Sequence, residues 1–209
     1  MIKISETVLG IHFTQYGVLP RNFSGLIGIV TSPLIHADFS HLIANSTSFL
    51  ILATALFFFY RKVALEIFIL NYFMAGIFLW LGGREAYHIG ASGVIYGLAA
   101  FLLFSGLLKK DMRLLTISLI VVFLYGSMIW GIFPIEPGIS WDGHLMGAAS
   151  GTILALLFYK QGPPVQAFEE ENDEEDEDEE ENDDPVKAPD SDQLLEIPEN
   201  KSGAGQQNQ

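Results

Sequence analysis

The sequence predicts an all-α polytopic membrane protein, a helical bundle followed by an acidic C-terminal tail. Half of its 209 residues are hydrophobic and only 17% are charged. The apolar residues come in blocks of about 18 to 20, the length at which a helix crosses a bilayer. Residues 1–167 hold nine Lys/Arg and seven Asp/Glu, whereas residues 168–209 hold two and eighteen. The formal charge of −14 therefore belongs to the tail.

The first 40 residues contain no block of spanning length. Residues 1–13 have polar and charged side chains scattered through them and lack the continuous apolar core of a cleavable signal peptide. Residues 16–36 are interrupted by prolines and glycines, which favours a folded loop or a segment lying on the surface. We therefore expect an N-terminal segment and loop at residues 1–40.

The bundle is expected at residues 41–160, with Asp38 or Ser40 capping its first helix. Its five spans are residues 41–60, 63–81, 92–108, 114–133 and 143–159. Only Arg84 closely flanks a span on one side of this alternating topology. The basic residues on the other side are Arg61, Lys62, Lys109, Lys110, Arg113 and Lys160. Because Lys and Arg mark cytoplasmic ends, we expect a multi-pass protein of the plasma or inner membrane of a bacterium, with a cytoplasmic C-terminus.

The tail is expected at residues 161–209. Gly162 and the two prolines after it break the last helix, and residues 168–184 are almost entirely Glu, Asp and Asn. Such a run buries too little apolar area to offset its ordering entropy, so we expect disorder. The main interpretation is a solvated cytoplasmic tail, and the alternative is a segment that binds a basic partner.

A candidate nucleophile stands at the start of the third span, where Ser92 lies between Ala91 and Gly93. Small residues there also suit close helix packing, so the pattern is weak alone. His144, at the start of the fifth span, is the best-placed base, because a neutral imidazole accepts a proton near pH 7. The alternative for His144 is a hydrogen-bonded interfacial histidine. We expect Asp142 to lie in the preceding loop, so the pair is interpreted as a dyad rather than a triad.

Glycines at four-residue spacing follow both residues, which predicts small-residue faces that let the two helices approach closely. They are Gly93 and Gly97 after Ser92, and Gly143, Gly147 and Gly151 around His144. His41 and Asn45 share one helix face and can donate to a single oxygen, as an oxyanion site requires. Capping is the alternative for Asn45. Tyr96 follows Ser92 by one turn and can stack on His144 or serve as an interfacial aromatic.

Together these motifs resemble the rhomboid family of intramembrane serine proteases, over roughly residues 16–159. The residues that carry the resemblance are His36, His41 and Asn45, then Gly90-Ala91-Ser92-Gly93 with Tyr96, then Gly143-His144 with Gly147 and Gly151. The resemblance implies that Ser92 is the nucleophile and His144 the base. It implies that His41, Asn45 and the Ser92 amide form the oxyanion hole, and that Tyr96 stacks on the base, with His36, Gly90 and Gly93 supporting.

The resemblance also implies a bundle with a water-filled outer cavity and cleavage of transmembrane segments of other proteins. Residues 17–32 would be a membrane-embedded first loop. The partners expected are transmembrane protein substrates and the lipid bilayer, with no nucleic acid, and no cofactor or metal is expected. The family core has six spans, so we expect an upstream apolar stretch of about 15 to 20 residues and an internal start at Met1.

Three other functions compete with proteolysis. A catalytically silent rhomboid-like protein would bind transmembrane clients with the same bundle. A membrane esterase would apply the same dyad to lipid. A transporter is disfavoured, because no inverted repeat is visible and Glu66, near a helix end, is the only acidic residue inside a span.

Overall fold

The computed structural model describes residues 2–124, 130–135 and 138–164, all within one compact unit, Met1–Glu169. Within these residues every regular element is a helix, and the only β pairing is an isolated bridge between Val18 and His88. The all-α fold class is therefore confirmed. The acidic run expected to be disordered, residues 168–184, lies outside the described residues.

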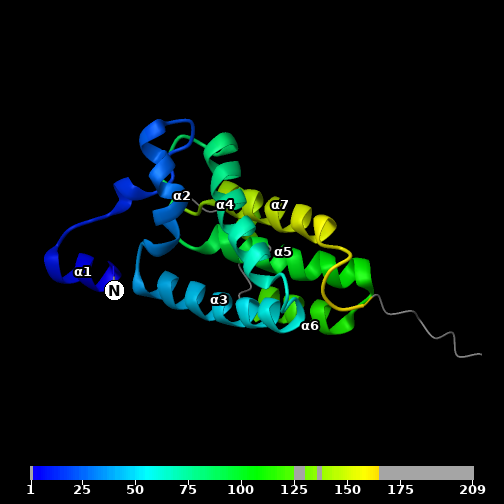
Figure 1. The fold of residues 1–209 in the computed structure, drawn as a ribbon. Helices are drawn as coiled ribbons and strands as arrows, with labels where there is room; N and C mark the ends of the chain where they lie inside the picture. The colour runs from blue at the N-terminus through cyan, green and yellow to red at the C-terminus, as the bar shows by residue number, and fades with distance from the viewer. Residues whose placement is uncertain (1, 125–129, 136–137, 165–209) are drawn as a thin grey trace, which may run out of the picture. The chain divides into compact units, whose positions relative to one another are not determined.

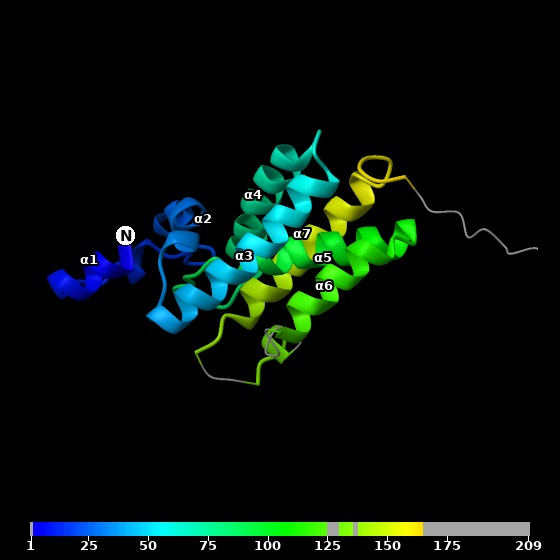
Figure 2. The ribbon, with the colours of Figure 1, turned by 90° about the horizontal axis from the view of Figure 1, so that it is seen from below.

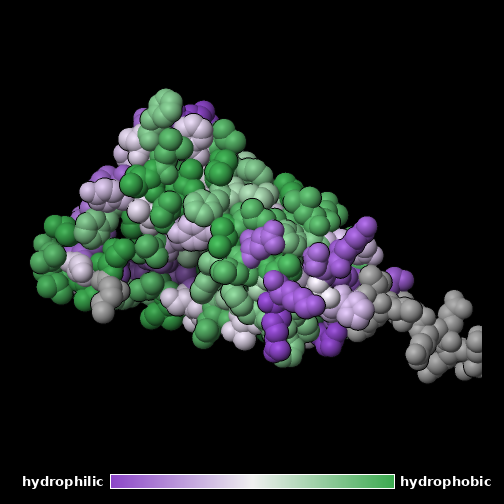
Figure 3. Space-filling view, viewed as in Figure 1, coloured by the Kyte–Doolittle hydropathy of each residue, from purple (hydrophilic) through white to green (hydrophobic). Residues whose placement is uncertain are grey.

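Five helices form the bundle (Figure 1). They are α3 (Phe39–Phe59), α4 (Ala64–Gly82), α5 (Ser92–Lys109), α6 (Met112–Leu124) and α7 (Trp141–Leu157). The helices α3, α4 and α5 are long and apolar enough to cross a membrane. Large hydrophobic side chains such as Leu50 and Leu65 are exposed on them, as lipid contact requires. Figure 3 shows a largely hydrophobic face with hydrophilic residues gathered at the turn between α3 and α4. The chain is an integral membrane protein.

The fourth expected span differs most from the structure. It was expected at residues 114–133, but Trp130–Ile132 form a separate short 3₁₀ turn, η4, and residues 125–129 lie outside the described residues. The N–H of Ile135 donates to Phe133 rather than to Gly131, four residues back. The Gly131 carbonyl is thereby left without its helical donor and is available to another group.

The central helix is α5. Of its apolar stretch 61% is buried, against 28% for α3 and for α4, and it contacts α3, α4, α6 and α7. A Cβ at Gly147 would lie 2.0 Å from the carbonyl oxygen of Gly93, and one at Gly151 would lie 1.9 Å from that of Gly97. The backbones of α5 and α7 therefore touch where both helices carry glycine.

A buried asparagine in α4 joins the same two helices. Asn71 is fully buried, donates to the Val94 carbonyl of α5 at 2.9 Å and accepts from the Ser150 hydroxyl of α7 at 3.1 Å. A buried amide costs free energy unless its polar atoms have partners, and here both ends are bonded. Asn71 therefore fixes the register of three helices.

Residues 2–34 form short helices around one end of the bundle. They are α1 (Ile2–Leu9), η1 (Thr14–Tyr16), η2 (Phe23–Ile27), α2 (Gly28–Thr31) and η3 (Ser32–Leu34). With eight residues, α1 is about 12 Å long, too short to cross a bilayer. The loop after it folds back on itself, because a Cβ at Gly28 would lie 2.2 Å from the Val18 nitrogen. The loop packs on α4, where the Tyr72 hydroxyl donates to Val30.

The helices α3, α5 and α7 all begin at the same end of the bundle, and α4 and α6 run in the opposite direction (Figures 1 and 2). The three N-terminal turns that carry His41, Ser92 and His144 therefore meet at one end, beside the first loop.

Candidate active site

Ser92 and His144 are hydrogen-bonded to each other. Ser92 is the first residue of α5 and His144 lies in the first turn of α7. The Ser92 hydroxyl oxygen is 2.8 Å from His144 Nε2. This is the distance that proton transfer from a serine to a general base needs.

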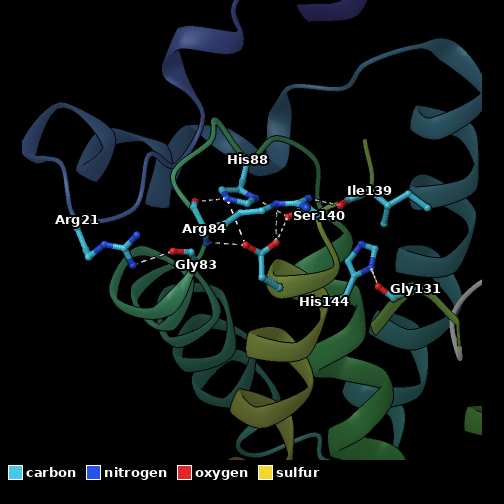
Figure 4. Close-up of polar contacts among 9 residues, drawn as sticks. Arg21, Gly83, Arg84, His88, Gly131, Ile139, Ser140 and His144 are labelled. Atoms are coloured by element: carbon cyan, nitrogen blue, oxygen red, sulfur yellow. Dashed lines mark hydrogen bonds and ion pairs between the residues drawn. The ribbon is translucent and has the colours of Figure 1, made fainter. Parts of the chain in front are cut away.

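The second ring nitrogen of His144 fixes which nitrogen carries the proton. His144 Nδ1 lies 2.8 Å from the Gly131 carbonyl oxygen, which only accepts hydrogen bonds (Figure 4). Nδ1 must therefore carry the hydrogen, and the unprotonated Nε2 faces the Ser92 hydroxyl. This is the tautomer that a general base requires.

Tyr96 covers one face of His144. The two rings are stacked, with 4.1 Å between their centroids and 7° between their planes. A Cβ at Gly131 would lie 2.2 Å from the Tyr96 hydroxyl and 3.0 Å from His144 Nδ1. The imidazole is therefore held by Tyr96 on its face and by the Gly131 backbone at its edge.

His41 and Asn45 lie on α3, facing the backbone just before Ser92. The carboxylate of Asp38 caps this helix by accepting from the His41 amide at 2.8 Å. Gly90 has a φ of +107°, which favours glycine, and a Cβ there would lie 3.1 Å from His41 Cε1 and 3.6 Å from Asn45 Nδ2. The Asn45 Nδ2 is buried and has no hydrogen-bond partner among the described residues, so its N–H groups are free to donate to a ligand.

His36 lies behind this face rather than at the dyad. Its ring meets that of His41 edge to face, with centroids 5.4 Å apart. Burial, and then the nearby His41, lower the pKa of His36 below its ordinary value. Neither of its ring nitrogens has a hydrogen-bond partner in the part of the chain that the structure describes.

One cavity of about 1020 Å³ connects these groups. Its lining includes His41, Asn45, Ser92, Tyr96 and His144. Among the described residues, no group of three or more His, Cys, Asp or Glu is arranged to hold a metal ion. The site can therefore offer a nucleophile, a base and a free amide donor to one molecule in the cavity.

Asp142 is where the sequence interpretation was wrong. It was expected in a loop, but it lies in the first turn of α7 and is buried. Its carboxylate accepts from the Arg84 backbone N–H at 2.8 Å and lies 3.6 Å from His88 Nε2, away from the His144 ring. Asp142 therefore does not join Ser92 and His144 as a third member, because in the described part of the chain the group bonded to His144 Nδ1 is the Gly131 carbonyl.

The sequence interpretation also missed Gly131, His88 and Ser140. A backbone carbonyl such as that of Gly131 leaves no signal in a sequence. Asp142 and His88 did leave one, because ionisable residues next to apolar spans usually have a partner or a function.

Comparison with known proteins places the chain in a family. The family model for the Rhomboid domain matches residues 24–161. The chain is 33% identical over 170 residues to the uncharacterized protein Rv1337 of Mycobacterium tuberculosis, covering 75% of this chain and 69% of the relative. It is 35% identical over 159 residues to the uncharacterized protein ML1171 of Mycobacterium leprae, covering 69% and 61%.

A third relative, from Bacillus subtilis, carries the name "Putative rhomboid protease YdcA". It is 31% identical over 134 residues, which cover 62% of this chain and 65% of that protein. No solved structure matches the chain.

Proposed function

The chain belongs to the rhomboid family, and from that premise we propose that it is an intramembrane serine endopeptidase that cleaves transmembrane segments of other membrane proteins. The observation that carries the proposal is the Ser92–His144 hydrogen bond of 2.8 Å, with His144 in the tautomer of a base. A silent client-binding protein would need neither the hydrogen bond nor the tautomer.

In the proposed reaction, His144 Nε2 takes the Ser92 proton as the serine oxygen attacks the carbonyl carbon of the scissile peptide bond. The imidazolium that forms keeps its Nδ1–H on the Gly131 carbonyl, and the face of Tyr96 favours its positive charge. The imidazolium then protonates the leaving amine, which leaves an acyl group on Ser92. Water hydrolyses that ester with His144 again as the base.

The oxyanion of the tetrahedral intermediate needs donors already in place. We assign this role to His41, Asn45 and the Ser92 amide. The unpartnered Nδ2 of Asn45 supports the assignment, because a buried amide donor without a partner is costly unless a ligand uses it.

The substrate would enter from the end of the bundle where α3, α5 and α7 begin. Basic residues gather at the other end, among them the exposed Arg61 and Lys62, and such residues favour the cytoplasmic side of a membrane. We therefore propose that the cavity opens to the outer side of a bacterial membrane, that the C-terminus is cytoplasmic, and that the acidic tail is available to a basic partner.

The test is cleavage of a reporter transmembrane substrate by reconstituted protein, with Ser92→Ala as the matched control. We expect cleavage by the parent alone, and covalent labelling of the parent at Ser92 by a fluorophosphonate. Label at Ser105 or Ser150 would refute the assignment of the nucleophile. A parent that hydrolyses a lipid ester but leaves the reporter intact would be an esterase.

A further inference from the structure

Four residues outside the dyad form a polar cluster between the loop before α5 and the first turn of α7 (Figure 4). Arg84 and His88 belong to the loop, and Ser140 and Asp142 to the start of α7. We call these residues the Asp142 cluster. The sequence interpretation gave none of them a role in the site beyond excluding Asp142 as a third catalytic member.

Asp142 is the centre of the cluster. It is 2% exposed, and its Oδ2 accepts from the Arg84 backbone N–H at 2.8 Å. The Arg84 Nε is 3.8 Å from Oδ1, and His88 Nε2 is 3.6 Å from Oδ2. A buried carboxylate needs a hydrogen-bond donor and a nearby positive charge, and Arg84 supplies both, so the first turn of α7 is bound to the loop at this point.

His88 and Ser140 add a second connection. The Nε2 of His88 lies 3.1 Å from the Arg84 carbonyl, which can only accept, so in the neutral ring Nε2 carries the hydrogen. Nδ1 then accepts from the Ser140 hydroxyl at 2.7 Å. The single Ser140 proton is used in that bond, and the 3.5 Å contact from Ser140 to Asp142 is weaker.

The loop before α5 also contacts the first loop of the chain, on the side away from α7. His88 exchanges two backbone hydrogen bonds with Val18, at 2.8 and 2.9 Å, and the Arg21 side chain donates to the Gly83 carbonyl at 2.9 Å. The Arg84 guanidinium also donates to the carbonyl of Ile139. The loop that the Asp142 cluster connects to α7 is therefore itself hydrogen-bonded to the first loop of the chain.

The position of the cluster along the chain suggests its role. The loop runs directly into Ser92, and Asp142 precedes His144 by two residues. The glycine contacts hold α5 against α7 from Gly93 onward, and they include the first turn of α7, where a Cβ at Gly93 would lie 3.2 Å from the Gly143 carbonyl oxygen. Because a serine and its base must be held within about 0.5 Å of their working geometry, the hydrogen bond from the loop to Asp142 adds a second constraint on this turn beside the contact with α5.

We propose that Asp142 is a positioning residue of the dyad, which holds the first turn of α7 against the loop that carries Ser92 and so keeps His144 between Ser92 and Gly131. The measurements of turnover rest on the proposed protease function, whereas a measurement of the His144 ring tautomer does not depend on it.

The experiment compares Asp142→Ala and Asp142→Asn with the matched control Asp111→Ala. Asp111 is also fully buried and bonded to one arginine, with 2.7 Å between its Oδ2 and Arg113 Nη2, but it lies directly before α6, at the other end of the bundle. All three variants remove a buried carboxylate, so they should lower the thermal unfolding midpoint alike. The variants should differ in their effect on the reactivity of Ser92 and on the tautomer of His144.

For Asp142→Ala we expect kcat on the reporter, and the rate of fluorophosphonate labelling at Ser92, to fall by about 10- to 100-fold with KM nearly unchanged, because a small misplacement of catalytic groups costs that much. Asp142→Asn should lose less, since its amide oxygen still accepts from Arg84. Asp111→Ala should keep kcat and the labelling rate.

The ¹⁵N shifts of the His144 ring, assigned with His144→Gln, should report one tautomer in the parent and Asp111→Ala and a mixture in Asp142→Ala. If both alanine variants lost kcat in proportion to their stability, or if Asp142→Ala kept both its kcat and a single tautomer, the positioning role would be wrong. A parent that neither cleaves nor labels would refute the protease function, and the tautomer comparison would still decide this inference.

Discussion

The ring of Tyr96 lies parallel to the imidazole of His144, with 4.1 Å between the ring centroids. The Gly131 carbonyl bonds to the edge of the same imidazole at 2.8 Å. These two contacts restrict the imidazole in different directions, since stacking fixes its plane and the hydrogen bond fixes its rotation within that plane.

Tyr96→Phe should therefore keep most activity, because phenylalanine retains the stack. Tyr96→Ala should lower kcat by roughly 2- to 10-fold, the equivalent of an aromatic pair worth about 0.5–1.5 kcal/mol. The measurement is kcat on the reporter substrate. Equal losses in both variants would show that the hydroxyl, rather than the stack, matters.

Gly131→Ala should impair the dyad by a steric route. The new Cβ would lie 2.2 Å from the Tyr96 hydroxyl and 3.0 Å from His144 Nδ1. We expect a loss of kcat in Gly131→Ala and a partial recovery in Gly131→Ala/Tyr96→Phe, where the nearest clashing atom has been removed. The check is a double-mutant cycle on kcat. If Tyr96→Phe lowered activity equally in both backgrounds, the two sites would not be in steric contact.

The sequence predicted the fold class and led to the pairing of Ser92 with His144, because both leave local patterns. Spans of apolar residues gave the positions of α3, α4 and α5 within a few residues. Glycine and polar residues at helix starts pointed to Ser92 and His144. In the structure the Ser92 hydroxyl oxygen lies 2.8 Å from His144 Nε2. These features depend on residues close together in the chain.

The rest depended on contacts that no local pattern encodes. The 3₁₀ turn Trp130–Ile132 inside the expected fourth span could not be foreseen from apolar composition, because apolar residues fit a long helix and a short turn alike. The backbone of Gly131 orients the base only because the Ile135 N–H bonds elsewhere. The sequence pattern predicts that the last helix begins at residue 143, two residues after its observed start at Trp141, and so it predicts a loop position for Asp142. The contact of Asp142 with Arg84, 58 residues away in the chain, leaves no local pattern.

Ser92→Ala and His144→Ala should each abolish cleavage while leaving the protein folded. The two residues act as one unit, so the double variant should be no slower than the slower single variant. Rates from a reporter assay, with unfolding midpoints as the control for folding, test this. A double variant far slower than either single variant would contradict the dyad.

Asn45→Ala should lower kcat by about a hundredfold or more without preventing folding, as the loss of one oxyanion donor does in a well-studied protease. His41→Ala should lower kcat in the same direction. Ser46→Ala is the matched control, because Ser46 is on the same helix and its exposed hydroxyl donates to the Leu42 carbonyl at 2.7 Å. Asn45→Ala with parental kcat and a lowered unfolding midpoint would return Asn45 to a structural role.

Gly151→Ala should destabilise the bundle, whereas Gly82→Ala should not. A Cβ at Gly151 would lie 1.9 Å from the Gly97 carbonyl oxygen and 2.9 Å from the Phe101 nitrogen, which are backbone atoms that cannot move without separating α5 from α7. Overpacking costs about 1–3 kcal/mol or more, and it exceeds the gain of up to about 1 kcal/mol in helix propensity when glycine becomes alanine.

At Gly82 the nearest atom is the terminal methyl carbon of Met146, at 2.9 Å, at the end of a flexible side chain that can turn aside. The same substitution there should leave stability within about 1 kcal/mol of the parent. Unfolding midpoints of both variants in detergent make the comparison. Since Gly97 and Gly151 lie below the dyad on α5 and α7, the loss of stability in Gly151→Ala should be accompanied by slower fluorophosphonate labelling of Ser92. A destabilised variant that labels at the parental rate would mean that the glycine contacts support the bundle without setting the distance from Ser92 to His144.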